Sequence, residues 1–449
     1  MLNEATLHFV SQHTHDDVRM LALRGCKNPE VNLPLALQQI QGRQTARRKL
    51  PSWAAIDGIV YPPHLNMEQC SSEATARYKA QIVKSKSVNS KLIDLTGGFG
   101  VDFAFMSEGF DEAVYVERDE QLCAIATHNF QILGLDNVTT VCADAETVLS
   151  PLTLHSSLFS LHSSLFTLIY LDPARRDTHG AAQIVNAKFV NRKYIALADC
   201  IPNVITMMPG LLQKASHVML KLSPMLDWRK AVADLAPHHV SDIHIVAVDN
   251  ECKELLLILA PPTEDSCYPR ITCADIRSRD GSCAIYTPGT YNYSPPLSGK
   301  TQRVVDFCPE MEPRAGTDSG SRCPSVTNAP WTFLYEPNAA VMKAGCFREL
   351  SEDFGIAQLS VNSHLFCSDR LIDDFPGRRF RLQAICSMNK RELKATLGHL
   401  RQANIAVRNF PLTAEQLRQR LKLADGGTDY IFATTLANDS HALLLCSKF

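Results

Sequence analysis

Four acidic residues in the first half of the chain each stand where a short apolar run ends. Asp94 ends "KLID", Glu117 ends "EAVYVE", Asp144 follows "VTTVCA" and Asp172 follows "LIYL". In an open parallel sheet, ligands bind outside the carboxyl ends of the strands, so these four side chains would line one crevice. A single such acid is more often only a solvated strand end. Four acids at matching positions favour a binding site.

The second and third of these acids have the chemistry of nucleoside recognition. A carboxylate after the second strand can accept both hydroxyl protons of a ribose, and one after the third can receive the amino group of adenine. The fourth acid begins a different pattern, because Asp172 is followed by Pro173 and then by the adjacent cations Arg175 and Arg176.

A glycine-rich turn precedes these acids. "LIDLTGGFGVD" places Gly97, Gly98 and Gly100 between a predicted strand and a predicted helix. There a missing Cβ lets a ligand approach the backbone, and the helix N-terminus faces that ligand. The alternative is a turn that only connects two elements. A dinucleotide fingerprint needs G-x-G-x-x-G, and Phe103 occupies the third glycine position, which weakens a dehydrogenase interpretation.

The elements that must position these residues follow from the apolar pattern. Residues 1 to about 85 are predicted to be helical, with apolar residues at helical spacing in "LPLALQQIQGRQTARRKL". From 91 to 260, apolar runs alternate with helical segments, which indicates βαβ units and a parallel sheet. The runs in 243–248 and 251–260 are separated by a short polar turn and predict a hairpin.

Two further segments are predicted to lie outside this core. "LHSSLFS" at 154–160 is repeated as "LHSSLFT" at 161–167, which indicates an insertion before the fourth strand. Residues 308–330 are rich in Pro, Gly, Ser and Thr and are predicted to form a flexible loop. A last compact unit is expected from about 375 to the end.

Length and composition exclude several classes of protein. At 449 residues we expect two or three domains, and the net charge of −2 identifies no partner. The N-terminus lacks the pattern of a secretory signal, and no run reaches the roughly 18 apolar residues of a membrane span, so we expect a cytoplasmic protein. The fifteen cysteines include no C-x-x-C pair, which favours reduced thiols over disulfides or a metal site.

With these residues in place, the chain resembles the class I S-adenosylmethionine-dependent methyltransferases over about residues 65–260. More narrowly, it resembles an uncharacterised bacterial family of methyltransferases with a ferredoxin-like segment and a C-terminal THUMP-like domain. Five motifs in order carry this second resemblance, which covers nearly the whole chain: "EQCSSEATARYKA" (68–80), "DLTGGFGVD" (94–102), "LDPARRD" (171–177), "LKLSPMLD" (220–227) and "NECKELL" (250–256).

The resemblance implies roles for the crevice residues. S-adenosylmethionine would be the cofactor, held by Asp94, Thr96, Gly97, Gly98, Gly100, Glu117 and Asp144. Asp172 and the carbonyl of Pro173 would face the methyl acceptor. Enzymes that methylate base amino groups have an aromatic ring at the fourth motif position, where this chain has Arg175, whose guanidinium could stack on a base or bind phosphate. Methylation at C5 of uracil needs a cysteine after the fifth strand, and "LKLSPMLD" has none.

Three of the motifs also have simpler interpretations. "EQCSSEATARYKA" is either a helix capped by Ser71 or Ser72, with Glu73 in its first turn, or a lid over the donor. Lys221 is either a phosphate ligand or the partner of an acid in the crevice. "NECKELL" is better explained by the hairpin than by a site.

The C-terminal unit is locally basic. Between Arg378 and Lys422 eleven Lys or Arg residues face only two acids, Glu392 and Glu415. Such asymmetry indicates a polyanion as partner, and the similarity to THUMP domains favours RNA; the alternative is a pair of ordinary solvated basic helices. We expect these helices in "NKRELKATLGHLRQANIAV" and, capped near Thr413, in "VRNFPLTAEQLRQRLKL". The predicted RNA-binding residues are Arg378, Arg379, Arg381, Lys390, Arg391, Lys394 and Arg408.

The sequence thus predicts an α/β protein in four parts. These are a helical region (1–85), a class I methyltransferase domain with a Rossmann-like sheet (86–262), a middle segment with a ferredoxin-like part (263–374) and a basic THUMP-like domain (375–449). The expected activity is methyl transfer from S-adenosylmethionine to RNA, either tRNA or rRNA. Alternatives are a methyltransferase of proteins or small molecules, and a non-catalytic RNA-binding protein that retains the donor pocket.

Overall fold

The computed structural model describes residues 2–84, 89–149, 166–175, 197–262, 268–288 and 331–449. They form two compact units. The first combines Met1–Val248, Lys253–Pro269 and Ile276–Ser282, and the second combines Asp249–Cys252, Arg270–Asp275 and Cys283–Phe449. The repeat at 154–167, except for the Phe166 and Thr167 that begin a strand, and the loop at 308–330 lie outside the described residues.

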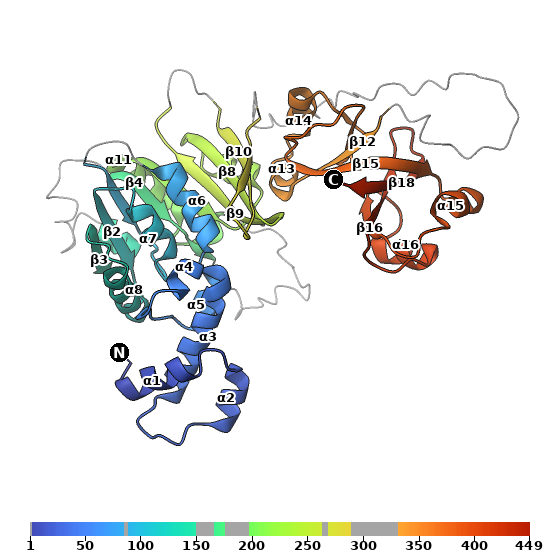
Figure 1. Ribbon diagram of the computed structural model, residues 1–449. Helices are drawn as coiled ribbons and strands as arrows, with labels where there is room; N and C mark the ends of the chain where they lie inside the picture. Colours follow the sequence, from blue (N-terminus) through green and yellow to red (C-terminus); the bar gives the residue numbers. More distant parts are fainter. Residues whose placement is uncertain (1, 85–88, 150–165, 176–196, 263–267, 289–330) are drawn as a thin grey trace, which may run out of the picture. The chain divides into compact units, whose positions relative to one another are not determined.

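The N-terminal region is helical, as predicted (Figure 1). Polar side chains cap four of its helices: Asn3, Asp17, Asn32 and Ser72 each accept a backbone N–H from the first turn. The helices are α1 (Glu4–Gln12), α2 (Val18–Arg24), α3 (Leu33–Lys49), α4 (Pro51–Ala54), α5 (His64–Gln69) and α6 (Glu73–Val83). Among the described residues, no helix is both long and apolar enough to cross a membrane.

A nine-stranded sheet follows, with the order β11-β10-β8-β9-β7-β4-β1-β2-β3. Neighbouring strands from β3 to β7 in this order are parallel, whereas β9 is antiparallel to β7. The βαβ prediction and the closing hairpin are therefore confirmed. The strands are β1 (Lys91–Asp94), β2 (Glu112–Glu117), β3 (Val138–Cys142), β4 (Phe166–Leu171), β7 (Ala215–Leu222), β8 (Val240–Val248), β9 (Glu251–Leu259), β10 (Arg270–Ile276) and β11 (Cys283–Tyr286).

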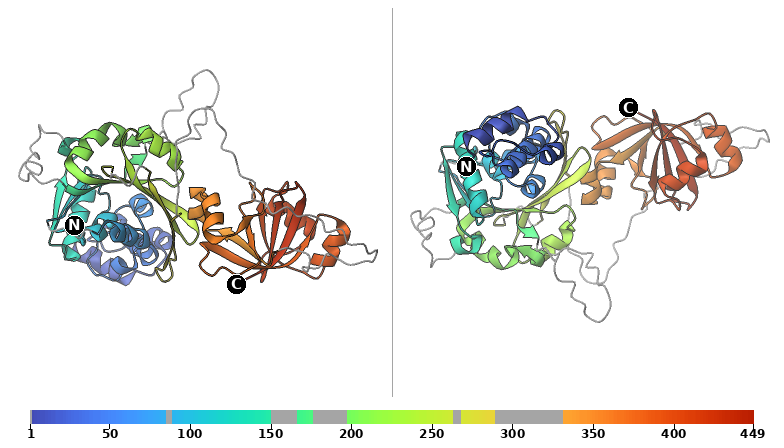
Figure 2. Two further views of the ribbon diagram at one scale, coloured as in Figure 1. Left: turned by 90° about the horizontal axis from the view of Figure 1, so that it is seen from above. Right: turned by 90° about the horizontal axis from the view of Figure 1, so that it is seen from below.

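Helices cover both faces of this sheet (Figure 2). The green helices α11 (Val204–Lys214) and α12 (Trp228–Asp234) lie on one face, and the blue N-terminal helices lie on the other. On the N-terminal side, α7 (Val101–Ser107) and α8 (Glu120–Ile132) join one apolar core with β1, β2 and α4. Three rings anchor this core, since Phe103, Tyr115 and Phe130 have centroids 5.2–5.5 Å apart.

Short elements complete the edge of the sheet that carries the predicted site. The helix α9 (Ala145–Leu149) follows β3. Beyond β4, β5 (Ala174–Arg175) pairs antiparallel with β6 (Cys200–Ile201), which follows the 3₁₀ turn Leu197–Asp199.

The second unit contains a seven-stranded sheet of order β13-β14-β12-β15-β18-β17-β16. One sheet thus spans residue 375, where we expect a domain boundary, because β15 pairs with both β12 and β18. Its strands are β12 (Phe333–Pro337), β13 (Ala357–Gln358), β14 (Phe366–Ser368), β15 (Gly377–Cys386), β16 (Asn404–Arg408), β17 (Asp429–Thr435) and β18 (His441–Lys448). Its helices are α13 (Ala339–Ala344), α14 (Phe347–Phe354), α15 (Lys390–Leu397) and α16 (Ala414–Leu421).

One predicted helix in this unit is too long. The segment 389–407 is helical only over α15, which ends before Gly398, and Asn404–Arg408 forms β16 instead. This segment forms a strand because Ile405 and Val407 are β-branched and pair in parallel with β17. The second helix begins as predicted, with Thr413 and Gln416 forming a capping box.

Candidate active site

The glycine turn lies between β1 and α7, and two of its three glycines are required for a different reason from the third. A Cβ on Gly97 would lie 2.0 Å from the Tyr115 ring, and one on Gly100 would lie 2.7 Å from Phe130, so both are required by close packing. Gly98 has a φ of +56°, and the nearest atom to its Cβ position is a backbone oxygen 3.9 Å away. The space above Gly98 is therefore open, which suits a ligand that approaches the backbone.

Glu117, at the end of β2, is fixed beside this turn. One of its carboxylate oxygens accepts the Gly98 N–H at 2.7 Å, and the other accepts the Asp119 N–H at 2.8 Å. Each oxygen keeps a lone pair, so the carboxylate can still accept two hydroxyl protons. Asp144 lies at the same edge of the sheet and is exposed, and its Oδ1 accepts the Glu146 N–H in the first turn of α9.

Asp94 and Thr96 connect the tip of β1 to the tip of β4. Asp94 is 1% exposed and accepts the Thr96 N–H at 2.9 Å. The Thr96 hydroxyl in turn accepts the Asp172 N–H at 2.6 Å. Burial raises the pKa of Asp94 well above its ordinary value, against the effect of the Thr96 hydrogen bond, and the nearby carboxylates raise it further. These surroundings favour the neutral acid.

Asp172 forms an ion pair with Lys221 of β7. The Lys221 ammonium contacts Asp172 Oδ2 and lies 3.8 Å from Asp102 Oδ2. Burial lowers the pKa of Lys221, but the attraction of the carboxylates outweighs burial, so the pKa is raised and the group stays an ammonium. The Asp172 side chain is 39% exposed and that of Lys221 only 11%, so the pair opens toward solvent through Asp172. Lys221 was expected to be either a phosphate ligand or the partner of an acid in the crevice, and in the structure it is the partner of Asp172.

A second ion pair lies behind the first. Lys79 of α6 is completely buried and lies 3.1 Å from Asp102 Oδ1 and 2.5 Å from Glu254 Oε2 of β9. The Ser71 hydroxyl lies 2.7 Å from Asp102 and 3.1 Å from Glu254, and the Tyr170 hydroxyl donates to Asp102 at 2.8 Å. Burial would raise the pKa of Asp102, but Lys79 and Lys221 outweigh it, and the pKa is lowered.

These contacts define an ion network of five side chains: Lys79, Asp102, Asp172, Lys221 and Glu254. Each of the five sequence motifs contributes one of them. Segments as far apart as residues 79 and 254 therefore meet at one place, directly beside the glycine turn. The network sets two ammonium groups against three carboxylates.

Three members of the ion network were not predicted from the sequence as site residues, namely Lys79, Asp102 and Glu254. Each lies inside one of the five motifs. A charged residue next to apolar residues, such as Glu254 before "LLLIL", could have indicated a buried charge. The two alternatives for the cap of α6 are resolved, because Ser72 is the N-cap and Ser71 belongs to the ion network's surroundings.

Pro173 is buried, and Arg175 takes part in the β5–β6 pair through its backbone. The side chain of Arg175 lies outside the described part of the structure.

The predicted RNA-binding residues fall into two groups. Arg378 and Arg408 both contact Glu336, whose side chain is 4% exposed, and Arg379 lies 2.8 Å from Asp373. Both acids lie before the basic segment 378–422 in the sequence, so part of that segment's positive charge is neutralised in the fold. The other group is exposed: Arg381, which lies against the Phe333 and Phe449 rings, and Lys390, Arg391 and Lys394 of α15.

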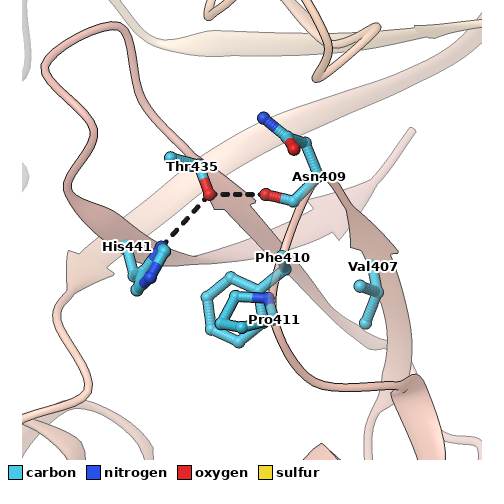
Figure 3. Close-up of a pocket in the computed structure, with 6 residues that line it drawn as sticks. All are labelled: Val407, Asn409, Phe410, Pro411, Thr435 and His441. Carbon is cyan, nitrogen blue, oxygen red and sulfur yellow. Dashed lines mark hydrogen bonds between the residues drawn. The ribbon is translucent and has the colours of Figure 1, made fainter.

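A small pocket of about 420 Å³ lies in the second unit (Figure 3). The Thr435 hydroxyl donates to the Asn409 carbonyl at 2.5 Å and lies 3.1 Å from His441 Nδ1. The rings of Phe410 and His441 meet edge to face at 5.3 Å. The Thr435 hydroxyl is therefore engaged within the protein, and the rings of Phe410 and His441 form part of the pocket's lining. Its lining comprises Val407, Asn409, Phe410, Pro411, Thr435 and His441.

Comparison with known proteins agrees with these observations. A ferredoxin-like domain family matches residues 333–376, and a THUMP domain-like family matches residues 377–448. An uncharacterized S-adenosylmethionine-dependent methyltransferase of Mycobacterium tuberculosis is 22% identical over 360 residues, which are 80% of this chain and 79% of that protein. The crystal structure of a provisionally assigned methyltransferase from Porphyromonas gingivalis W83 is 28% identical, with a TM-score of 0.75 over 100% of both chains.

The strand order, the glycine turn followed by acids at the strand ends, and these matches together have one explanation. The chain is a class I S-adenosylmethionine-dependent methyltransferase with ferredoxin-like and THUMP-like domains toward its C-terminus.

Proposed function

We propose that this protein transfers a methyl group from S-adenosylmethionine to RNA, with Asp172 at the acceptor side of the site. The observation that carries the proposal is the half-exposed Asp172 carboxylate, paired with Lys221 and joined through Thr96 to the tip of β1. This arrangement brings a proton acceptor next to the glycine turn. Such proximity is the main requirement for transfer from a donor that is already activated.

The donor fits the residues of the glycine turn. The open space at Gly98 would admit the donor, Glu117 would accept the two ribose hydroxyls, and Asp144 would receive the adenine amino group. Asp94, Thr96, Gly97 and Gly100 would hold the shape of the turn. When bound, the donor supplies a methyl group activated by the positive charge of its sulfonium.

The charge of the ion network also suits this donor. Its two ammonium groups face three carboxylates, and the surplus carboxylate charge would be balanced by a sulfonium cation. A neutral or anionic ligand would not supply that balance. Asp172 and the Pro173 carbonyl would then orient the acceptor, and Arg175 would stack on a base or bind a phosphate.

RNA as acceptor is supported by the second unit. Its similarity to THUMP domains covers residues 377–448, and its exposed cations include Arg381, Lys390, Arg391 and Lys394. Because Arg378, Arg379 and Arg408 are already paired with acids, we expect the four exposed cations to contribute more to phosphate binding. An RNA substrate also agrees with the cytoplasmic location that we expect from the sequence.

The test is transfer of a radiolabelled methyl group from S-adenosylmethionine to extracts of a strain that lacks the gene. The extract is fractionated into RNA, protein and small molecules after reaction, and the Asp172→Ala variant serves as control. Label in an RNA size class that is absent with the variant supports the proposal. Label only in protein or small molecules contradicts the RNA assignment, and donor binding without label in any fraction contradicts the enzymatic role.

A further inference from the structure

We infer that the acceptor atom is a ribose 2′-hydroxyl oxygen, which the Asp172–Lys221 pair holds by two opposite hydrogen bonds. This inference rests on the proposed function and specifies its chemistry. It starts from the composition of the pair, in which a carboxylate that only accepts hydrogen bonds touches an ammonium that only donates them.

A hydroxyl matches such a pair. It carries one O–H donor and two acceptor lone pairs. The O–H can donate to Asp172 while one lone pair accepts from Lys221, and the second lone pair remains for bonding to the methyl carbon. In RNA the 2′-hydroxyl is the hydroxyl present at every internal nucleotide.

A base amino group matches the pair poorly. Both of its N–H groups need hydrogen-bond acceptors. With the Lys221 ammonium fixed beside the carboxylate, one amino N–H would face another donor instead of an acceptor. The burial and the raised pKa of Lys221 mean that this ammonium cannot readily lose its proton to remove the conflict. The fourth motif residue is Arg175 rather than an aromatic residue, so the ring against which a flipped base would stack is also missing from the motif.

The rest of the ion network explains why Lys221 stays in place. The buried Asp102 lies 3.8 Å from its ammonium, and Lys79 lies 3.1 Å from Asp102. Glu254 and the Tyr170 hydroxyl complete the shell around Lys79 and Asp102. Lys79, Asp102 and Glu254 are therefore positioning residues, which fix an ammonium whose charge can stabilise the oxygen as it loses its proton.

The reaction is balanced without any further reactant. The hydroxyl oxygen forms a bond to the methyl carbon while the bond between that carbon and sulfur breaks, and the bonding electron pair stays on sulfur as a neutral thioether. The hydroxyl proton passes to the Asp172 carboxylate and from there to solvent through its exposed side.

The experiment uses the purified full-length protein, S-adenosylmethionine with a deuterated methyl group, and total RNA from a strain lacking the gene. The RNA is digested to nucleosides, and fragmentation in a mass spectrometer shows whether the heavy methyl leaves with the ribose or stays on the base. Label on the ribose supports the inference. Label on the base overturns it and leaves the proposed function standing, whereas RNA without label overturns both.

Two variants test the role of Lys221, and one altered substrate tests the role of the 2′-hydroxyl. Lys221→Met should lower transfer at least about 100-fold while donor affinity changes by less than about threefold. Lys230→Met removes an exposed lysine paired with Asp234 and should leave transfer unchanged. Should Lys221→Met fail to fold, a transcript with deoxyribose at the modified nucleotide decides the question with the unaltered protein. That transcript should accept no methyl group, and methylation of it would overturn the inference.

Discussion

Charged side chains are arranged differently in the two compact units. In the first unit, Lys79 and Lys221 lie below the surface and each is held between carboxylates. In the second, most of the basic residues that the structure describes lie at the surface, either in partly exposed pairs such as Arg379–Asp373 or turned to solvent as in α15. Burial fixes the geometry of a charge and makes its loss costly, whereas exposure leaves it free to attract a polyanion over a distance. The comparison distinguishes the residues that we propose to organise the chemistry from the residues that we propose to bind the RNA.

The largest expected effect on folding comes from removing the buried cation. Lys79→Met leaves Glu254 buried without its cation and Asp102 with only the more distant Lys221, and the free energy of unfolding should fall by about 3–5 kcal/mol. Urea unfolding of the full-length protein measures this loss. The matched control, Lys230→Met, removes an exposed lysine paired with Asp234 and should change the free energy by less than about 1 kcal/mol. Equal losses for the two variants would contradict the distinction between buried and surface charge.

The second prediction compares alanine substitutions at two glycines, in order to distinguish an effect on donor binding from an effect of backbone strain. Gly98 and Gly134 both have positive φ and open space at the Cβ position, but only Gly98 lies in the glycine turn. Alanine at either position should cost about 1–2 kcal/mol of stability. Gly98→Ala should also weaken donor affinity by at least about tenfold in a calorimetric titration, because its methyl group occupies the proposed donor space. A donor affinity that is equally reduced in Gly134→Ala would refute this assignment.

The third prediction concerns the salt dependence of RNA binding by the exposed cations of α15 in the second unit. Replacing Lys390, Arg391 and Lys394 by Gln should reduce the slope of log affinity for RNA against log salt by about 2, since each contacted phosphate contributes about 0.7 for single strands. Arg379→Gln is the control, because this arginine is already paired with Asp373, and its effect on the slope should be smaller. Filter binding over a salt series provides the measurement. An unchanged slope in the triple variant would remove α15 from the RNA-binding surface.

The smallest expected effect concerns the proton on Asp94. Its folded-state pKa is raised, so the stability it contributes is complete below the unfolded pKa of about 3.9 and is lost as pH rises through the folded value. Asn mimics the neutral acid and removes this loss. The Tm of Asp94→Asn should therefore exceed that of the unaltered protein by a margin that grows with pH, within a few degrees. A margin that is constant between pH 4 and pH 9 would show that Asp94 is not held neutral.

Much of the first unit could be predicted because its information is local. The apolar runs in 91–94, 112–117 and 138–142 identify strands, and their ends place Asp94 and Glu117 at one edge of a parallel sheet. Ser72 and Thr413 indicate helix starts through their own capping chemistry.

What could not be predicted depends on contacts between distant residues. Nothing in the local sequence indicates that Lys79 pairs with Glu254, because 175 residues separate them and only the sheet brings them together. The local sequence of the second unit likewise does not indicate that Glu336 pairs with arginines from two other strands, β15 and β16. The boundary of α15 depended on whether 404–408 pairs with β17, which is again a tertiary contact.

Asp172 is proposed to act on the methyl acceptor and not to hold the donor. Asp172→Asn keeps the size and the backbone contact to Thr96 but removes the proton acceptor. Donor affinity by calorimetry and single-turnover methyl transfer to RNA, measured on the same preparation, test this directly. We expect the donor Kd of this variant to stay within about threefold of that of the unaltered protein and its transfer rate to fall at least about 1,000-fold. Transfer at a rate within about threefold of the unaltered protein would contradict it.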